Sequence, residues 1–146
     1  MKRRILVPLV AAVAGALALV LAGGAAAHPL GNFTVNHAAA IEVAGSTTYV
    51  HLVLDLAEIP TVQHGADVRR PAYAATLARS LELRLDGRPV PLTVVDRRAT
   101  TRPGAGGLET LRLDVVYRAE GTGTGISFRD RSFPDTVGWR EITSSA

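Results

Sequence analysis

Four histidines, at positions 28, 37, 51 and 64, are the residues of this sequence best suited to hold a metal ion. His28 is the most informative of them, because the small residues Ala25-Ala26-Ala27 before it suit a signal peptidase. Cleavage before His28 would give this residue a free α-amine beside its imidazole, and such donors suit copper, nickel, cobalt or zinc. Pro29 has no backbone N–H to join the metal, so a further imidazole would have to complete the site.

His37 and His51 are the candidates for that further ligand. His37 lies closest to His28 in the sequence, and His51 lies within an expected strand on the face opposite the leucines, where its side chain would be accessible. The sequence therefore predicts a metal site formed by His28, His37 and His51. The alternative is that these histidines are ordinary surface or core residues, since no pair of them has a recognised ligand spacing such as His-x-x-x-His.

Other polar residues give weaker indications of chemistry. Asp55 and Glu58 could act as metal ligands or as a carboxylate pair for acid–base catalysis. In the alternative interpretation Asp55 faces solvent and Glu58 pairs with an arginine at a strand end. No serine has a visible His-Asp arrangement, and glycines 104–107 are not followed by the Lys-Ser/Thr of a phosphate-binding loop. We therefore expect no catalytic residues, no enzyme activity and no cofactor other than a divalent metal ion (Ni, Co or Cu).

The first 27 residues have the features of a signal peptide. Three basic residues at positions 2–4 precede an apolar run over 5–21 and the small residues before His28. This predicts a signal peptide at 1–27 and an extracytoplasmic domain at 28–146, secreted or held on the outer side of the membrane. An uncleaved anchor is the alternative, because the apolar run has about the minimum length of a membrane span.

Removing the signal segment changes the charge of the chain. The formal net charge of +3 comes from 16 Lys and Arg against 13 Asp and Glu, and positions 2–4 hold three of the basic residues and none of the acidic ones. Residues 28–146 are therefore neutral overall, which argues against nucleic acid as a partner. The sequence has no Cys, so disulfides cannot stabilise the domain.

Alternating apolar residues predict a mainly β fold. Leu and Val recur at every second position over 50–56, 81–85 and 111–115, and Asp86-Gly87 suits a hairpin turn between 81–85 and 90–95. We expect one short helix over 67–80, a loop at 103–107, and further strands from 126 and over 137–142. These elements favour a β-sandwich-like domain with one short helix. Its last strand barely ends before residue 146, which suggests a domain truncated at the C-terminus.

Four segments of the mature chain carry a family resemblance. They read His-Pro-Leu-Gly-Asn-Phe-Thr-Val-Asn-His at 28–37, Asp-Leu-Ala-Glu-Ile-Pro-Thr at 55–61, Phe-Arg-Asp at 128–130 and Val-Gly-Trp-Arg-Glu-Ile at 137–142. In this order they resemble the exported N-terminal region of bacterial nickel/cobalt transporter-like membrane proteins. The resemblance implies an extracytoplasmic accessory domain that serves divalent metal traffic, with a membrane transporter component as its partner.

The resemblance also implies His28 and His37 as metal ligands. The sequence departs from the family pattern at Ala38, where a Tyr commonly follows the second histidine, and it lacks the multi-helix transport domain. It therefore does not imply transport activity for these residues. Two alternatives stay open, namely a free-standing exported domain that binds copper or another metal, and an interaction domain that docks through exposed strand edges without metal.

Overall fold

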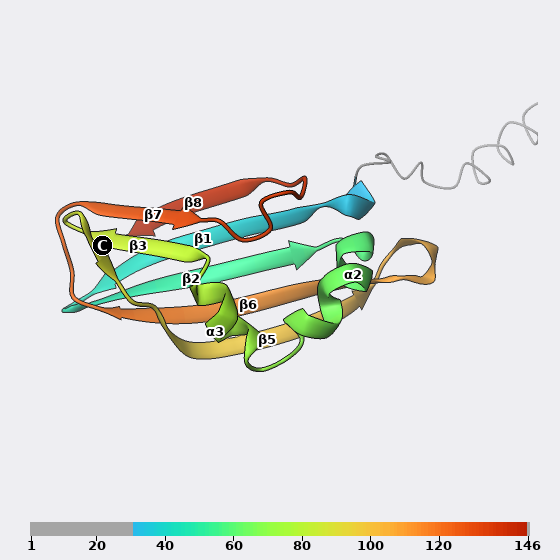
Figure 1. Cartoon of the computed structure of the whole chain (residues 1–146), viewed down its shortest axis with the longest axis horizontal. Helices are drawn as coiled ribbons and strands as arrows, with labels where there is room; N and C mark the ends of the chain where they lie inside the picture. Colours follow the sequence, from blue (N-terminus) through green and yellow to red (C-terminus); the bar gives the residue numbers. More distant parts are fainter. Residues whose placement is uncertain (1–30, 146) are drawn as a thin grey trace, which may run out of the picture.

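Strands with one buried face dominate the computed structural model, which describes residues 31–145 (Figure 1). Within these residues the fold is mainly β, with two sheets and two α-helices, and it is consistent with a β-sandwich-like domain. His28 and the predicted signal peptide lie outside the described residues. No helix within the described part is long and apolar enough to cross a membrane.

The larger sheet has five strands in the order β5-β6-β2-β1-β8. Their bounds are Val35–Ala44 (β1), Thr47–Leu56 (β2), Thr93–Pro103 (β5), Glu109–Glu120 (β6) and Arg140–Ser145 (β8). Pairing is antiparallel throughout except at one edge, where β8 lies parallel to β1. Within residues 31–145 the last strand therefore lies beside the first.

The smaller sheet has the order β4-β3-β7 and is antiparallel. It consists of Leu81–Leu85 (β3), Arg88–Val90 (β4) and Ile126–Asp130 (β7). Two α-helices connect β2 to β3, namely Glu58–Val68 (α2) and Tyr73–Ala78 (α3), and short 3-10 turns occupy Gly31–Phe33 (η1) and Ala105–Gly107 (η2). The two sheets meet where β7 ends and β8 begins, since Asp130 and Arg140 form an ion pair of 3.2 Å.

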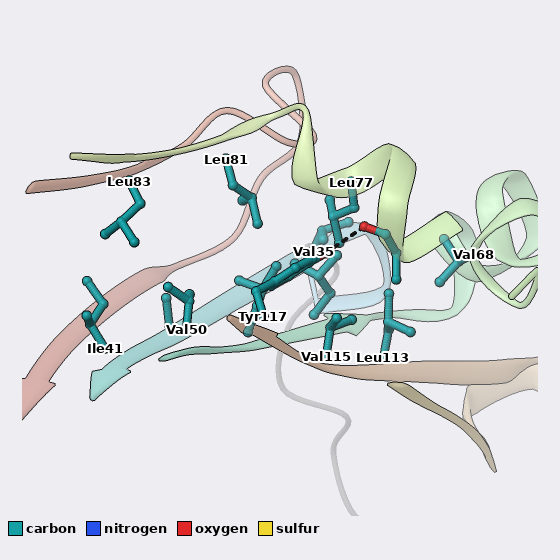
Figure 2. Close-up of a cluster of buried hydrophobic side chains, with 14 of the residues drawn as sticks. Val35, Ile41, Val50, Val68, Leu77, Leu81, Leu83, Leu113, Val115 and Tyr117 are labelled. Atoms are coloured by element: carbon teal, nitrogen blue, oxygen red, sulfur yellow. Dashed lines mark hydrogen bonds between the residues drawn. The ribbon is translucent and has the colours of Figure 1, made fainter. Parts of the chain in front are cut away.

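The core lies between the two sheets and under the helices. Figure 2 shows side chains from β1, β2 and β6 facing those from β3 and α3. Leu52, Leu54 and Leu113 are almost fully buried at the centre of the larger sheet. The hydroxyl of the buried Tyr117 donates a hydrogen bond of 2.9 Å to the carbonyl oxygen of Ala74, which ties α3 to β6. Burial removes this phenol from water and raises its pKa.

Most of the elements expected from the sequence are present. The structure confirms strands at 50–56, 81–85 and 111–115, the loop at 103–107 and the hairpin turn at Asp86-Gly87, whose residues both have positive φ. Of the segment 90–95 only residue 90 pairs with β3, because the chain then crosses to the larger sheet as β5. The helix expected over 67–80 is the six-residue α3, and β1 and the longer α2 were not predicted.

Candidate functional site: a buried ionic cluster around His37

His37 is a polar residue on the apolar face of β1. Val35, His37, Ala39 and Ile41 alternate inwards along this strand, and all four are buried. His37 retains only 2% of its accessible surface, so it lies as deep as the aliphatic residues beside it. A buried imidazole needs polar partners, because unpaired burial of a polar group is costly.

The partners of His37 come from the other end of the sequence. Its Nδ1 lies 2.5 Å from Asp130 Oδ2, at the end of β7 in the smaller sheet. Arg140, the first residue of β8, places Nη1 3.0 Å from the same Nδ1 and 3.2 Å from Asp130 Oδ2. Ser132 donates hydrogen bonds to Asp130 Oδ1 from its hydroxyl, at 2.6 Å, and from its backbone, at 2.7 Å. We call His37, Asp130, Ser132 and Arg140 the ionic cluster.

The chemistry of these groups fixes the proton on the imidazole. A guanidinium only donates hydrogen bonds and a carboxylate only accepts them, so the Nδ1 proton of His37 goes to Asp130. Arg140 then pairs with the carboxylate, and its Nη2 donates a 2.7 Å hydrogen bond to the carbonyl oxygen of Ser132. The other ring nitrogen of His37, Nε2, is buried and finds no hydrogen-bond partner within residues 31–145.

Asp130 is the anion of the cluster. Burial raises the pKa of its carboxyl, but hydrogen bonds from His37 and Ser132 outweigh this effect and hold the pKa below its usual range. Asp130 is therefore ionised at neutral pH, opposite the guanidinium of Arg140. The cluster joins the two sheets, because His37 and Arg140 belong to the larger sheet and Asp130 to the smaller one.

The segment that precedes β8 closes over the end of β1. The backbone N–H groups of Val35 and His37 donate to the carbonyl oxygens of Val137 and Trp139. The side chain of Asn36 accepts a 3.2 Å hydrogen bond from the N–H of Trp139. Between these contacts Gly138 lies so close to Val35 that a Cβ placed there would be 1.9 Å from the carbonyl oxygen of Val35.

The other predicted site residues lie apart from this cluster. His51 is exposed on the opposite face of the larger sheet, as expected, with Nε2 3.5 Å from Glu42. His37 and His51 point to opposite faces of the same sheet, so one ion cannot bind both. His28 lies outside the described residues, and the prediction that it binds metal stays a prediction.

Asp55 and Glu58 have separate roles. Asp55 lies on the outer face of the sheet, where it pairs with Arg112 at 3.1 Å. Glu58 is buried and accepts a 2.6 Å hydrogen bond from the backbone N–H of Ala105. The expected pairing of Glu58 with an arginine was therefore wrong. The loop 103–107 approaches α2 closely enough for the backbone to take that place.

The ionic cluster does not have the geometry of a hydrolytic triad. The hydroxyl of Ser132 donates its hydrogen bond to Asp130 and lies 3.5 Å from Nδ1 of His37, the ring nitrogen that already contacts Asp130. In a hydrolytic triad the nucleophile contacts the other ring nitrogen. Among residues 31–145 no three side chains of His, Asp or Glu are grouped closely enough to hold a metal ion. Although Nδ1–H donation to a carboxylate is typical of metal-binding histidines, Nε2 here is enclosed and out of reach of dissolved ions.

Sequence reasoning did not identify Asp130, Ser132 or Arg140 as partners of His37. Asp130 and Arg140 nevertheless lie inside segments 128–130 and 137–142, which carry the family resemblance together with 28–37. The structure brings these segments into contact around His37, and the backbone N–H of Ala57, in segment 55–61, donates to Thr34. The sequence feature that could have indicated these partners is that the segments occur in the same order as in the family that they resemble.

Comparison of the chain with protein-family models, curated proteins and solved structures finds no match in any of the three.

Proposed function

We propose that this chain is the extracytoplasmic accessory domain of a nickel/cobalt transporter-like membrane protein. The observation that carries the proposal is the contact between segments that are distant in sequence and together resemble that family. Segments 28–37, 128–130 and 137–142 meet at His37, Asp130 and Arg140, and segment 55–61 lies against Thr34. If each segment resembled the family only by chance, we would not expect their polar residues to meet in one hydrogen-bonded cluster.

In this proposal the ionic cluster has a structural role and metal contact falls to the start of the mature chain. Nδ1 of His37 is bound to Asp130, Nε2 of His37 is enclosed, and His51 lies on the other face of the sheet. His28 would supply an α-amine and an imidazole, without an amide nitrogen from Pro29. Two donors hold an ion less firmly than a closed site does, which suits the transfer of an ion better than its storage.

Calorimetric titration of the chain beginning at His28 tests this assignment. That chain keeps every residue of the core, and the titrants are Ni(II), Co(II), Cu(II) and Zn(II). We expect saturable binding of one ion per chain, lost in His28→Ala because one of the few ligands is removed. His51→Ala is the matched control and should bind as the unchanged chain does, since His51 lies on the outer face of the sheet.

A second candidate function, docking without metal, is favoured by the edge of β8, which pairs with no further strand within residues 31–145. The opposite edge strand, β5, has a bulge between Val94 and Asp96 and ends at Pro103, features that discourage strand addition. β8 has neither feature, and Trp139 and Ile142 at this edge are each about half exposed. Such an edge can accept an extended segment of a partner as an additional strand.

The same titration separates the two candidates. Absence of binding by a chain whose far-UV spectrum shows folded β structure would contradict metal binding at His28 and leave the docking function. Equal loss of binding in His28→Ala and His51→Ala would also contradict it, because the effect would then not depend on the mature N-terminus.

A further inference from the structure

The outer face of the smaller sheet has a shallow hollow of about 380 Å³. Its floor is formed by β3 and β7, where Glu82 and Arg84 alternate with the buried leucines of β3. The hollow is lined by Glu82, Arg84, Ser127, Phe128, Arg129 and Arg131. None of the four residues of the ionic cluster and none of residues 137–139 contributes to this lining.

The charges in the hollow do not balance. Both carboxylate oxygens of Glu82 are occupied, Oε1 by Arg84 Nε at 2.6 Å and Oε2 by Arg131 Nη2 at 2.8 Å. Arg129 is the cross-strand neighbour of Glu82, yet within the described part of the chain it forms no ion pair. Three guanidinium groups therefore surround one carboxylate.

Contacts within the hollow also fix the orientation of two of its arginines. Arg84 is held at two points, since its Nη1 donates a 2.9 Å hydrogen bond to the carbonyl oxygen of Gly87 in the hairpin turn. Arg131 is held by Glu82 from the other side. The hydrogen bond from Arg84, together with the positive charges of the three arginines, lowers the pKa of Glu82. This carboxylate therefore stays ionised between Arg84 and Arg131.

We propose that this hollow is a binding site for a phosphate group, held by Arg129 together with Arg84 and Arg131. The lining has two positive charges in excess, which a phosphate group would offset in part as a singly charged phosphodiester and in full as a free dianion. Guanidinium groups bind phosphate oxygens through pairs of N–H donors, and fixed arginines lose little side-chain freedom on binding. The proposed phosphate site uses none of the residues of the proposed metal contact and does not depend on it.

The test uses the chain beginning at His28 and two sources of phosphate. Inorganic phosphate is titrated at low salt while amide chemical shifts are followed by NMR, and co-sedimentation with phosphatidylglycerol vesicles is compared with phosphatidylcholine vesicles. We expect saturable shifts in β3 and β7. Saturation by free phosphate would indicate a soluble phosphate ligand, whereas sedimentation with phosphatidylglycerol alone would indicate a lipid headgroup.

Two variants decide whether the hollow is responsible. Arg129→Ala should weaken binding about tenfold, because one charged donor group is lost. Arg98→Ala on the exposed edge strand β5 removes the same charge outside the hollow, and it should leave binding unchanged. Equal weakening by both variants would overturn the proposal, since binding would then follow net charge. Absence of binding in both assays would overturn it as well.

Discussion

Asp130 is the residue on which the ionic cluster depends. Its side chain is 6% exposed, and it satisfies His37, Ser132 and Arg140 at the same time. Removing one member of a buried ion pair costs more than the pair contributes, because the remaining charge stays buried without a counter-charge. The partner charge here, Arg140, is only partly buried, which moderates the expected cost.

Asp130→Ala should lower the free energy of unfolding by about 3 kcal/mol, because His37 and Arg140 lose their shared acceptor. Urea unfolding followed by far-UV circular dichroism measures this change. Asp114→Ala is the matched control, because Asp114 pairs with Arg112 on the exposed face of the larger sheet and should contribute less than about 1 kcal/mol. Equal costs for the two variants would contradict a structural role for the cluster.

The junction of β1 and β8 is the element most sensitive to added volume. Val137 and Trp139 accept hydrogen bonds from β1 on either side of Gly138, whose missing side chain lets the two backbones approach. No rearrangement of a flexible side chain can make room for a Cβ there, because the atom it would meet is the carbonyl oxygen of Val35.

Gly138→Ala should destabilise the domain by about 3 kcal/mol, at the upper end of overpacking effects. It should also increase hydrogen exchange in β8, because the segment that leads into this strand can no longer lie against β1. Gly106→Ala provides the comparison: Gly106 has φ +62° but open space around it, so we expect a cost of only about 1 kcal/mol. If Gly138→Ala costs no more than this, the close approach does not limit stability.

The sequence predicted those elements whose buried faces are apolar and whose exposed faces are polar. β1 lacked this contrast, because alanines occupy both faces at Ala38, Ala39 and Ala40. α2 was missed because its buried positions include Glu58, Thr61 and Gly65, so no apolar stripe marks the helix.

The site was less predictable than the fold, for a reason of distance along the chain. His37 could be selected as a chemically interesting residue, but its contacts with Asp130 and Arg140 span 93 and 103 positions. Residue spacing within one element indicates a shared face, whereas pairing between two sheets depends on how the whole chain closes. The sequence therefore could not distinguish a ligand from a buried structural histidine.

At the scale of the whole molecule the lowered pKa of Asp130 predicts acid sensitivity. A group whose pKa is lower in the folded state contributes stability above its unfolded pKa, near 4, and this contribution is lost as the pH falls through the folded value. Glu82 and Asp86 also have lowered pKa values, through hydrogen bonds led by Arg84 and by the backbone of Gly125 respectively. All three carboxyl groups are therefore expected to contribute to the acid dependence.

The urea midpoint of the unchanged chain should be steady from pH 7 to about pH 5 and should decrease below pH 4, where these carboxylates become protonated. The urea midpoint of Asp130→Asn should decrease less over the same range, because the buried carboxyl of Asp130 has been replaced by an amide that does not titrate. Identical pH profiles for the two chains would show that the Asp130 carboxyl gives no acid dependence.

The parallel contact between the first and last strands also determines when folding can finish. β1 pairs with β8 and its buried histidine contacts Arg140, so the β1 edge and the ionic cluster cannot form until the chain is available as far as β8. When a chain emerges with its N-terminus first, from a ribosome or through a membrane channel, His37 has no charged partners until Asp130 and Arg140 have emerged. Closure of the β1–β8 edge is in this sense a late folding step.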